Sequence, residues 1–224
     1  MASSAIRKHS ASLIFFHGSG ETGQILIDRV RYLLGRDFNF AHINVVYPTA
    51  PLQEYTPLKG QLSKVWFDRN AVDIADPIGK QNMTKGYEVA QQLIQHEVTH
   101  GIPLNRIIVG GFSMGGALAL HTGYHLTEGL AGVFTHSSFL YRNSVVFQSL
   151  RNRKFTKETL PELRMFHGQN DTLVPPEWGR ETSESLAKLG VSGTFTPLED
   201  TLHVLRRKSL LDIEQWILTK LPPL

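Results

Sequence analysis

Ser113 has the sequence surroundings that most clearly indicate chemistry. It is the centre of residues 111–115, Gly-Phe-Ser-Met-Gly, which match the G-x-S-x-G pattern. Branched apolar residues at 107–109 predict a buried strand before the pattern, and the small residues after it suit the start of a helix. A nucleophile elbow needs this strand–turn–helix context. The alternative is a glycine-rich turn that carries a bystander serine.

The two glycines of the pattern have a steric explanation. A serine on so sharp a turn has a strained backbone, and side chains two positions away would collide with neighbouring main chain. Glycine at 111 and 115 removes that collision. The turn would expose the Ser113 hydroxyl and point the free N–H groups of the following helix at an oxyanion.

A serine hydroxyl becomes a good nucleophile when a base accepts its proton and a third group orients that base. In an elbow fold these partners follow the serine in the order acid, then histidine. Asp171 lies four residues after an expected strand that ends at His167, and His203 lies six residues after Pro197, where the next strand is expected to end. Asp171 and His203 are therefore the predicted orienting acid and base.

Other acids and histidines are weaker candidates. Glu177 falls in the first turn of an expected helix, where the helix dipole alone favours an acid. Glu199 and Asp200 are so near His203 in sequence that their side chains are expected to point away from it. The remaining candidates lie in or beside expected helices, or at strand ends before Asp171: His96, His100, His121, His125, His17, His136 and His167.

Two backbone N–H groups are predicted to bind the oxyanion. One belongs to Met114, directly after the nucleophile, and the other to Ser19, in the loop of residues 17–20 that follows an early strand. A glycine-rich loop before a helix can also cradle a phosphate. That alternative is weak because the chain has neither a G-x-G-x-x-G pattern there nor a Walker lysine.

Apolar periodicity predicts strands that alternate with helices along the whole chain. Strands are expected at 13–16, 43–47, 107–109, 130–135, 163–167 and 193–197, and helices at 25–34, 89–98, 177–189 and 209–218. This alternation favours a mostly parallel sheet with helices on both faces. Residues 49–77 are expected to be irregular and to form at most a flap. The predicted organisation is a short tail over residues 1–11 and one α/β domain over residues 12–224, without a separate lid domain.

Composition excludes several classes of protein. The 224 residues include no cysteine, which removes disulfides, thiolate metal sites and a cysteine nucleophile. The 23 Lys and Arg residues are scattered, and the densest group, residues 206–208, suits a solvated helix face better than a nucleic-acid site. No apolar run reaches the ~20 residues of a membrane span, and the first residues lack a signal core. A cytoplasmic protein that binds no nucleic acid is the default expectation.

Taken together, the motifs resemble the acyl-protein thioesterase and lysophospholipase family. The matching segments fall in the family's order and cover nearly the whole chain: residues 17–20, 47–51, 65–68, 111–116, 167–171 and His203. Details at 7–14 and 216–221 look most like the lysophospholipase-like branch. The resemblance implies an α/β-hydrolase with catalytic Ser113, Asp171 and His203, and oxyanion donors at Ser19 and Met114. Two departures from many members, Met114 after the serine and Val204 after the histidine, leave substrate preference open.

The sequence therefore predicts a serine hydrolase that cleaves carboxylic esters or thioesters, including palmitoyl-cysteine in proteins, without a metal or cofactor. A short-chain carboxylesterase is the alternative, and a catalytically silent hydrolase fold that binds lipid or protein is a second one. Contact with membranes is expected to be peripheral at most, through the substrate. The proposed apolar acyl site combines an exposed aromatic loop with residues near strand ends: Trp66, Phe67, Phe139, Leu140, Leu173 and Val174.

Overall fold

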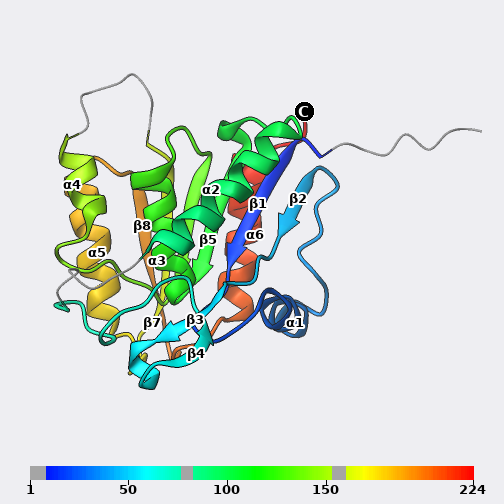
Figure 1. Cartoon of the computed structure of the whole chain (residues 1–224). Helices are drawn as coiled ribbons and strands as arrows, with labels where there is room; N and C mark the ends of the chain where they lie inside the picture. Colours follow the sequence, from blue (N-terminus) through cyan, green and yellow to red (C-terminus); the bar gives the residue numbers. More distant parts are fainter. Residues whose placement is uncertain (1–8, 77–82, 153–159) are drawn as a thin grey trace, which may run out of the picture.

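Six parallel strands form the central sheet of the computed structural model, which describes residues 9–76, 83–152 and 160–224 (Figure 1). The strands are β1 (Ala11–Phe16), β2 (Ile43–Val46), β5 (Ile107–Phe112), β6 (Gly132–His136), β7 (Glu162–Gly168) and β8 (Gly193–Leu198). They lie in the order β2-β1-β5-β6-β7-β8. Because all six are parallel, their carboxyl ends meet at one edge of the sheet, the lower edge in Figure 1.

Side chains that alternate along the central strands fill two separate cores. In β1, Ile14 and Phe16 join the core on one face of the sheet, whereas Leu13 and Phe15 join the core on the other. Successive residues of a strand point to opposite faces, so a strand covered on both faces is apolar throughout. This accounts for the continuous apolar runs in the sequence.

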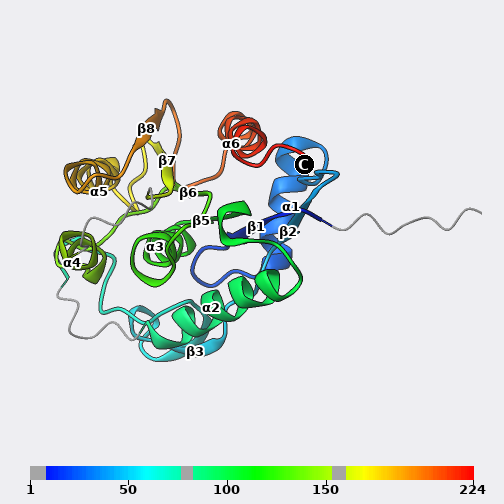
Figure 2. The ribbon, with the colours of Figure 1, turned by 90° about the horizontal axis from the view of Figure 1, so that it is seen from above.

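Helices cover both faces of the sheet (Figure 2). One face carries α1 (Gly23–Leu34) and α6 (Arg207–Lys220), and the other carries α2 (Thr84–Thr99), α3 (Met114–His121), α4 (Val145–Asn152) and α5 (Pro176–Lys188). Shorter helical turns are η1 (Thr56–Leu58), η3 (Leu104–Arg106) and the π-helical η4 (Thr122–Leu126). The predicted parallel sheet with helices on both faces is confirmed.

The segment expected to be irregular, residues 49–77, contains an antiparallel hairpin, so that prediction is wrong for its first half. β3 (Leu52–Tyr55) pairs with β4 (Gln61–Lys64) beyond the lower edge of the sheet in Figure 1. The chain reverses at Lys59 and Gly60, which have φ values of 57° and 79°. Lys59 is not a usual residue for such a conformation, and both strands are short, so the pattern gave little signal. Pro77, the last residue of the expected loop, lies outside the described residues.

Helix α4 is also absent from the sequence prediction. It has eight residues and starts with two β-branched valines, a pattern that does not separate a helix from a strand. Its buried residues Val146, Phe147 and Leu150 are spaced for one helix face and pack into the core that contains α3. Tertiary packing therefore decides the structure of this segment.

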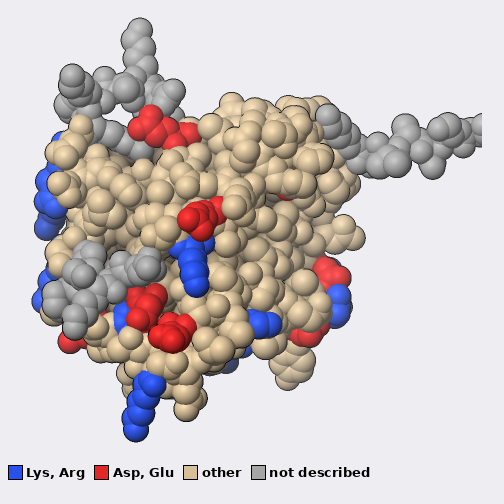
Figure 3. Space-filling model, viewed as in Figure 1, with Lys and Arg blue, Asp and Glu red and all other residues tan. Residues whose placement is uncertain are grey.

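Arg207, in the basic group at residues 206–208, connects α6 to the end of α1. Arg207 Nη1 donates hydrogen bonds to the carbonyl oxygens of Leu33 and Leu34, at 3.1 and 3.0 Å, where α1 ends. A cation near the last carbonyls of a helix is favourable. On the face drawn in Figure 3, Lys and Arg are scattered among Asp and Glu and form no continuous patch.

None of the helices in the described ranges is long and apolar enough to cross a membrane. Of the expected tail, residues 1–8 lie outside the described part of the chain, and β1 already begins at Ala11.

His121 is a buried histidine at the carboxyl end of α3. Its Nδ1 lies 2.7 Å from the Tyr87 hydroxyl, and its Nε2 lies 3.4 Å from Ser144 Oγ. Removal from water, and secondarily the nearby His125, lower the pKa of His121 to about 3. The folded protein therefore keeps this imidazole neutral down to low pH.

We expect His121 to make the fold sensitive to acid. Below about pH 6.5, His121 binds a proton in the unfolded chain but stays neutral in the folded protein. The free energy of unfolding therefore falls as pH drops from 6.5 towards 3. His121→Gln should remove about 1.4 kcal/mol per pH unit from this dependence. Urea unfolding at pH 7, 6 and 5 measures it, with the exposed His100→Gln as control. An unchanged slope in His121→Gln would contradict the prediction.

Candidate active site

Ser113 stands on a strained turn between β5 and α3. Its backbone has φ 54° and ψ −121°, a conformation that residues other than glycine rarely adopt. A Cβ on Gly111 would lie 2.1 Å from the carbonyl carbon of Gly115, and a Cβ on Gly115 would lie 2.4 Å from the Phe16 carbonyl oxygen. The two glycines therefore allow the turn to close against β1. The Ser113 N–H donates to the His136 carbonyl at 2.9 Å, which ties the turn to β6.

Asp171 and His203 form a close pair at the same edge of the sheet. His203 Nδ1 lies 2.7 Å from Asp171 Oδ2. The other carboxylate oxygen, Oδ1, accepts from the N–H groups of Leu173 and Val174, at 3.1 and 2.9 Å. Burial alone would raise the pKa of Asp171, but the hydrogen bonds from His203 and Val174 outweigh it and hold that pKa below its usual value. Asp171 is therefore an anion at neutral pH and accepts an Nδ1–H from His203.

Main-chain hydrogen bonds connect the loops that carry this pair. The Asn170 N–H donates to the Thr201 carbonyl and the Gln169 N–H to the Leu198 carbonyl, both at 2.9 Å. A Cβ on Gly168 would lie 2.3 Å from the Thr201 carbonyl oxygen, so glycine is needed for the two loops to approach. The β7 and β8 loops thus form one unit, which fixes the acid relative to the histidine.

Phe112 links His203 to the elbow. The centroid of its ring lies 4.9 Å from that of the His203 ring, and its main chain leads directly into Ser113. Because Nδ1 of His203 is engaged by Asp171, Nε2 is the ring nitrogen left for proton transfer. The structure thus brings the three predicted residues of the triad to one edge of the sheet.

The two predicted oxyanion donors lie at the ends of neighbouring strands, β1 and β5. Within the described ranges, neither the Ser19 N–H nor the Met114 N–H donates a hydrogen bond. The residue after Ser19 is held in place, because the Gly20 N–H donates to the Lys64 carbonyl of β4 at 2.9 Å. Both N–H groups therefore lack an acceptor among the described residues, as expected of oxyanion donors.

The histidines at strand ends support loops. His17 Nδ1 donates to the Gly18 carbonyl at 2.6 Å, and its Nε2 accepts from the Ala50 N–H at 3.0 Å. Burial lowers the pKa of His17, which keeps the neutral form that this pattern needs. His167 Nε2 likewise donates to the Val174 carbonyl at 2.8 Å. These contacts agree with a supporting role.

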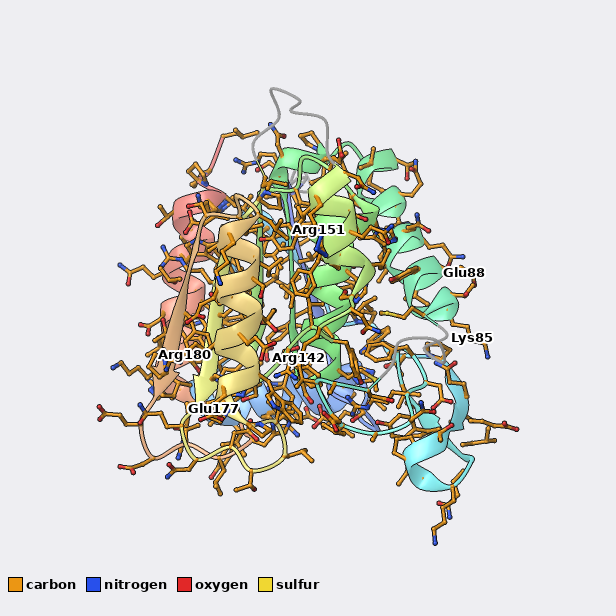
Figure 4. All side chains as sticks on the ribbon, turned by 90° about the vertical axis from the view of Figure 1, so that its left-hand side faces the viewer. Lys85, Glu88, Arg142, Arg151, Glu177 and Arg180 are labelled. Carbon is orange, nitrogen blue, oxygen red and sulfur yellow. The ribbon has the colours of Figure 1, made fainter. Side chains whose placement is uncertain are left out.

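The alternative acids lie differently. Glu177 is in the first turn of α5, at the lower end of that helix in Figure 4. Asp200 has a positive φ of 47°, and its carbonyl accepts a hydrogen bond from Arg206 Nη2 at 2.6 Å. Among the described residues, the carboxylate that contacts the His203 ring is that of Asp171.

The prediction of an exposed aromatic loop at Trp66 and Phe67 is wrong. Trp66 and Phe67 are buried in the core, with Trp66 packed against Phe16 at a ring distance of 5.2 Å and bonded through Nε1 to the His17 carbonyl at 2.8 Å. Of the other four residues expected at an acyl site, Phe139, Leu140 and Val174 are also buried. Leu173 is 54 % exposed. Aromatic side chains next to a sheet edge gain more from core packing than from solvent, which the local sequence does not reveal.

Glu21 and Arg29 also lie beside the site, although their sequence pattern does not mark them as functional. The one signal in the sequence is that Glu21 directly follows residues 17–20; Arg29 lies eight positions later, within α1. Within the described ranges, no group of three or more His, Asp or Glu side chains is arranged to hold a metal ion.

Comparison with known proteins identifies the family. Residues 2–221 match the phospholipase/carboxylesterase family. Lysophospholipase-like protein 1 of Mus musculus is 46% identical over 215 residues, which are 96% of this chain and 89% of the mouse protein. Acyl-protein thioesterase 1 of Neurospora crassa is 31% identical over 223 residues, 97% of this chain and 90% of that protein.

Solved structures agree on the fold. The crystal structure of Arabidopsis thaliana SOBER1 matches with a TM-score of 0.81 at 22% identity, over 94% of this chain and 99% of that one. Zea mays acyl-protein thioesterase 2 matches with a TM-score of 0.76 at 21% identity, over 96% and 95%. These matches confirm the α/β-hydrolase fold expected from the sequence. The family match and the two relatives confirm the expected family resemblance. The chain belongs to the phospholipase/carboxylesterase family.

Proposed function

We propose that this serine hydrolase of ester and thioester bonds is an acyl-protein thioesterase that works through an acyl-enzyme on Ser113. The observation that carries the proposal is the Asp171–His203 contact of 2.7 Å beside the strained elbow. A buried carboxylate, an imidazole with one free nitrogen and a serine on a sharp turn are the groups that nucleophilic acyl transfer needs.

In the first half of the reaction Ser113 Oγ attacks the carbonyl carbon of the substrate. His203 Nε2 accepts the hydroxyl proton as the new C–O bond forms. The carbonyl oxygen becomes an oxyanion, which accepts hydrogen bonds from the Ser19 and Met114 N–H groups. Collapse of this intermediate breaks the bond to the thiol or alcohol, which leaves with the proton from His203.

In the second half water releases the acyl group. His203 Nε2 takes a proton from water, which attacks the acyl carbon, and the same oxyanion donors stabilise the second intermediate. Ser113 leaves with the proton, and the product is a carboxylic acid. Asp171 holds Nδ1–H throughout and stabilises the imidazolium that forms in both halves.

The relatives support the choice of substrate. Two of the proteins compared above carry the name acyl-protein thioesterase, and they match over nearly the whole chain. We propose that S-acylated proteins are substrates of this chain as well, and that the enzyme acts in the cytoplasm. Leu173 is exposed and lies two residues beyond Asp171, and we propose that it contacts the acyl chain.

A short-chain carboxylesterase is the second candidate. Five of the six side chains expected at an acyl site are packed in the core, which leaves fewer apolar surfaces for a long chain: Trp66, Phe67, Phe139, Leu140 and Val174. This packing favours substrates with few acyl carbons. The chain-length series described below separates the two candidates.

Ser113→Ala should abolish turnover while the fold persists. If the triad behaves as in the measured serine proteases, kcat falls by ~10⁶. The decisive measurement is covalent labelling by an alkyl phosphonate, read by mass spectrometry. The wild-type protein should gain one adduct and the folded variant none. Labelling of folded Ser113→Ala would refute the assignment of the nucleophile.

Asp171→Asn should lower kcat by ~10⁴, because it preserves shape but removes the charge that stabilises the imidazolium. Asp200→Asn is the matched control, since its side chain is absent from the contacts of His203. Equal losses of kcat in both variants, or a larger loss in Asp200→Asn, would show that Asp171 is not the orienting acid.

Hydrolysis of acyl chains of two to sixteen carbons, as paired oxygen esters and thioesters, tests the substrate. An acyl-protein thioesterase should hold or raise kcat/KM up to sixteen carbons and should release palmitate from an S-palmitoylated peptide. Each CH₂ that is buried in an apolar acyl site contributes about 0.8 kcal/mol, so a site for long chains should not lose activity as the chain grows. A steep fall in kcat/KM beyond about four to six carbons, with no release of palmitate from that peptide, would favour the carboxylesterase instead.

A further inference from the structure

Glu21 and Arg29 form a charged pair next to the loop that carries Ser19. Arg29 Nη2 donates to Glu21 Oε1, and Glu21 Oε2 accepts from the Gly18 N–H at 3.2 Å. Both side chains are partly shielded from water, with 32% of the Arg29 side chain and 19% of the Glu21 side chain exposed. The carboxylate of Glu21 therefore joins the main chain just before Ser19 to a cation on α1.

Arg29 makes a second contact, with the elbow. Its guanidinium carbon lies 5.5 Å from the centroid of the Phe112 ring, within the range of a cation–π interaction. Phe112 is buried, precedes Ser113, and has its ring 4.9 Å from the ring of His203. The Arg29 guanidinium thus contacts both Glu21, which supports the Ser19 loop, and Phe112, which precedes Ser113 and packs against His203.

The loop and the elbow also meet directly. A Cβ on Gly18 would lie 3.1 Å from the Phe112 ring and 3.4 Å from Glu21 Oε2, so these groups are in close contact. Ser19 lies between two anchored amides, because Gly18 donates to Glu21 and Gly20 donates to the Lys64 carbonyl. Of these two anchors, the one at Gly18 depends on a side chain.

We propose that Glu21 and Arg29 are positioning residues, which hold the Ser19 N–H and the Phe112–His203 ring pair in fixed relation to Ser113. The inference rests on the proposed function, because it gives Ser19 and His203 their roles. Glu21 sets the oxyanion donor through Gly18, and Arg29 sets both Glu21 and the ring against which His203 packs.

Rate should depend on this pair more than stability does. A misplacement of about 1 Å at a reacting group can cost ~10² in rate. A partly exposed ion pair contributes little to the free energy of unfolding. Loss of the pair should therefore lower kcat with little change in KM or in the melting temperature, which a purely structural role would not produce.

Glu21→Ala and Arg29→Met test the proposal, with hydrolysis of 4-nitrophenyl butyrate and the rate of phosphonate labelling at Ser113 as readouts. The matched control is Arg31→Met on the same helix, which also loses an ion pair, to Asp37 at 2.9 Å. We expect kcat and the labelling rate to fall ~10- to 100-fold in both test variants, with KM within about threefold. Arg31→Met should keep the wild-type rate.

Two further variants show whether the pair acts as a unit. The double variant Glu21→Ala/Arg29→Met should lose less rate than the product of the two single losses, because both changes remove the same Glu21–Arg29 contact. Arg29→Lys keeps the charge beside Glu21 but loses the planar group over Phe112, so it should recover part of the rate.

Wild-type kcat and labelling rates in both single variants would overturn the inference, provided that the wild-type protein is labelled at Ser113. So would losses that match those of Arg31→Met or that follow the melting temperature. A wild-type protein that is not labelled at Ser113 would instead overturn the proposed function, and the inference with it.

Discussion

The site depends on the turn at Ser113, where a non-glycine residue holds a positive φ between a buried strand and a helix. Such a conformation costs of order 1–3 kcal/mol and persists when the surrounding structure enforces it. Here Gly111 and Gly115 pack without side chains against each other and against β1, and the Ser113 N–H is bonded to β6. The turn brings the serine hydroxyl and the Met114 N–H to the same edge of the sheet.

The parallel sheet supplies the remaining groups at that edge. Ser19 follows β1, Asp171 follows β7 and His203 follows β8, so residues far apart in sequence meet where the strands end. Close packing alone would not fix their relative positions. Hydrogen bonds between the Asp171 and His203 loops, and between Gly20 and β4, do this with main-chain atoms. The geometry of the site is thus largely a property of the backbone.

The sequence predicts the elements and the turn at Ser113 well, because both depend on local patterns: apolar runs for buried strands and glycine spacing for the turn. It predicts poorly where packing decides. Trp66 and Phe67 look like an exposed loop but are buried, the β3–β4 hairpin turns at a lysine, and α4 begins with two valines. The Glu21–Arg29 pair is invisible to pattern analysis because Arg29 meets Phe112 only in the folded chain.

A crystal structure of the protein after reaction with an alkyl phosphonate would show the nucleophile and the oxyanion donors together. We expect phosphorus bonded to Ser113 Oγ, the phosphoryl oxygen within hydrogen-bond distance of the Ser19 and Met114 N–H groups, and His203 still bonded to Asp171. Phosphorus on another residue, or a phosphoryl oxygen turned away from both N–H groups, would contradict this expectation.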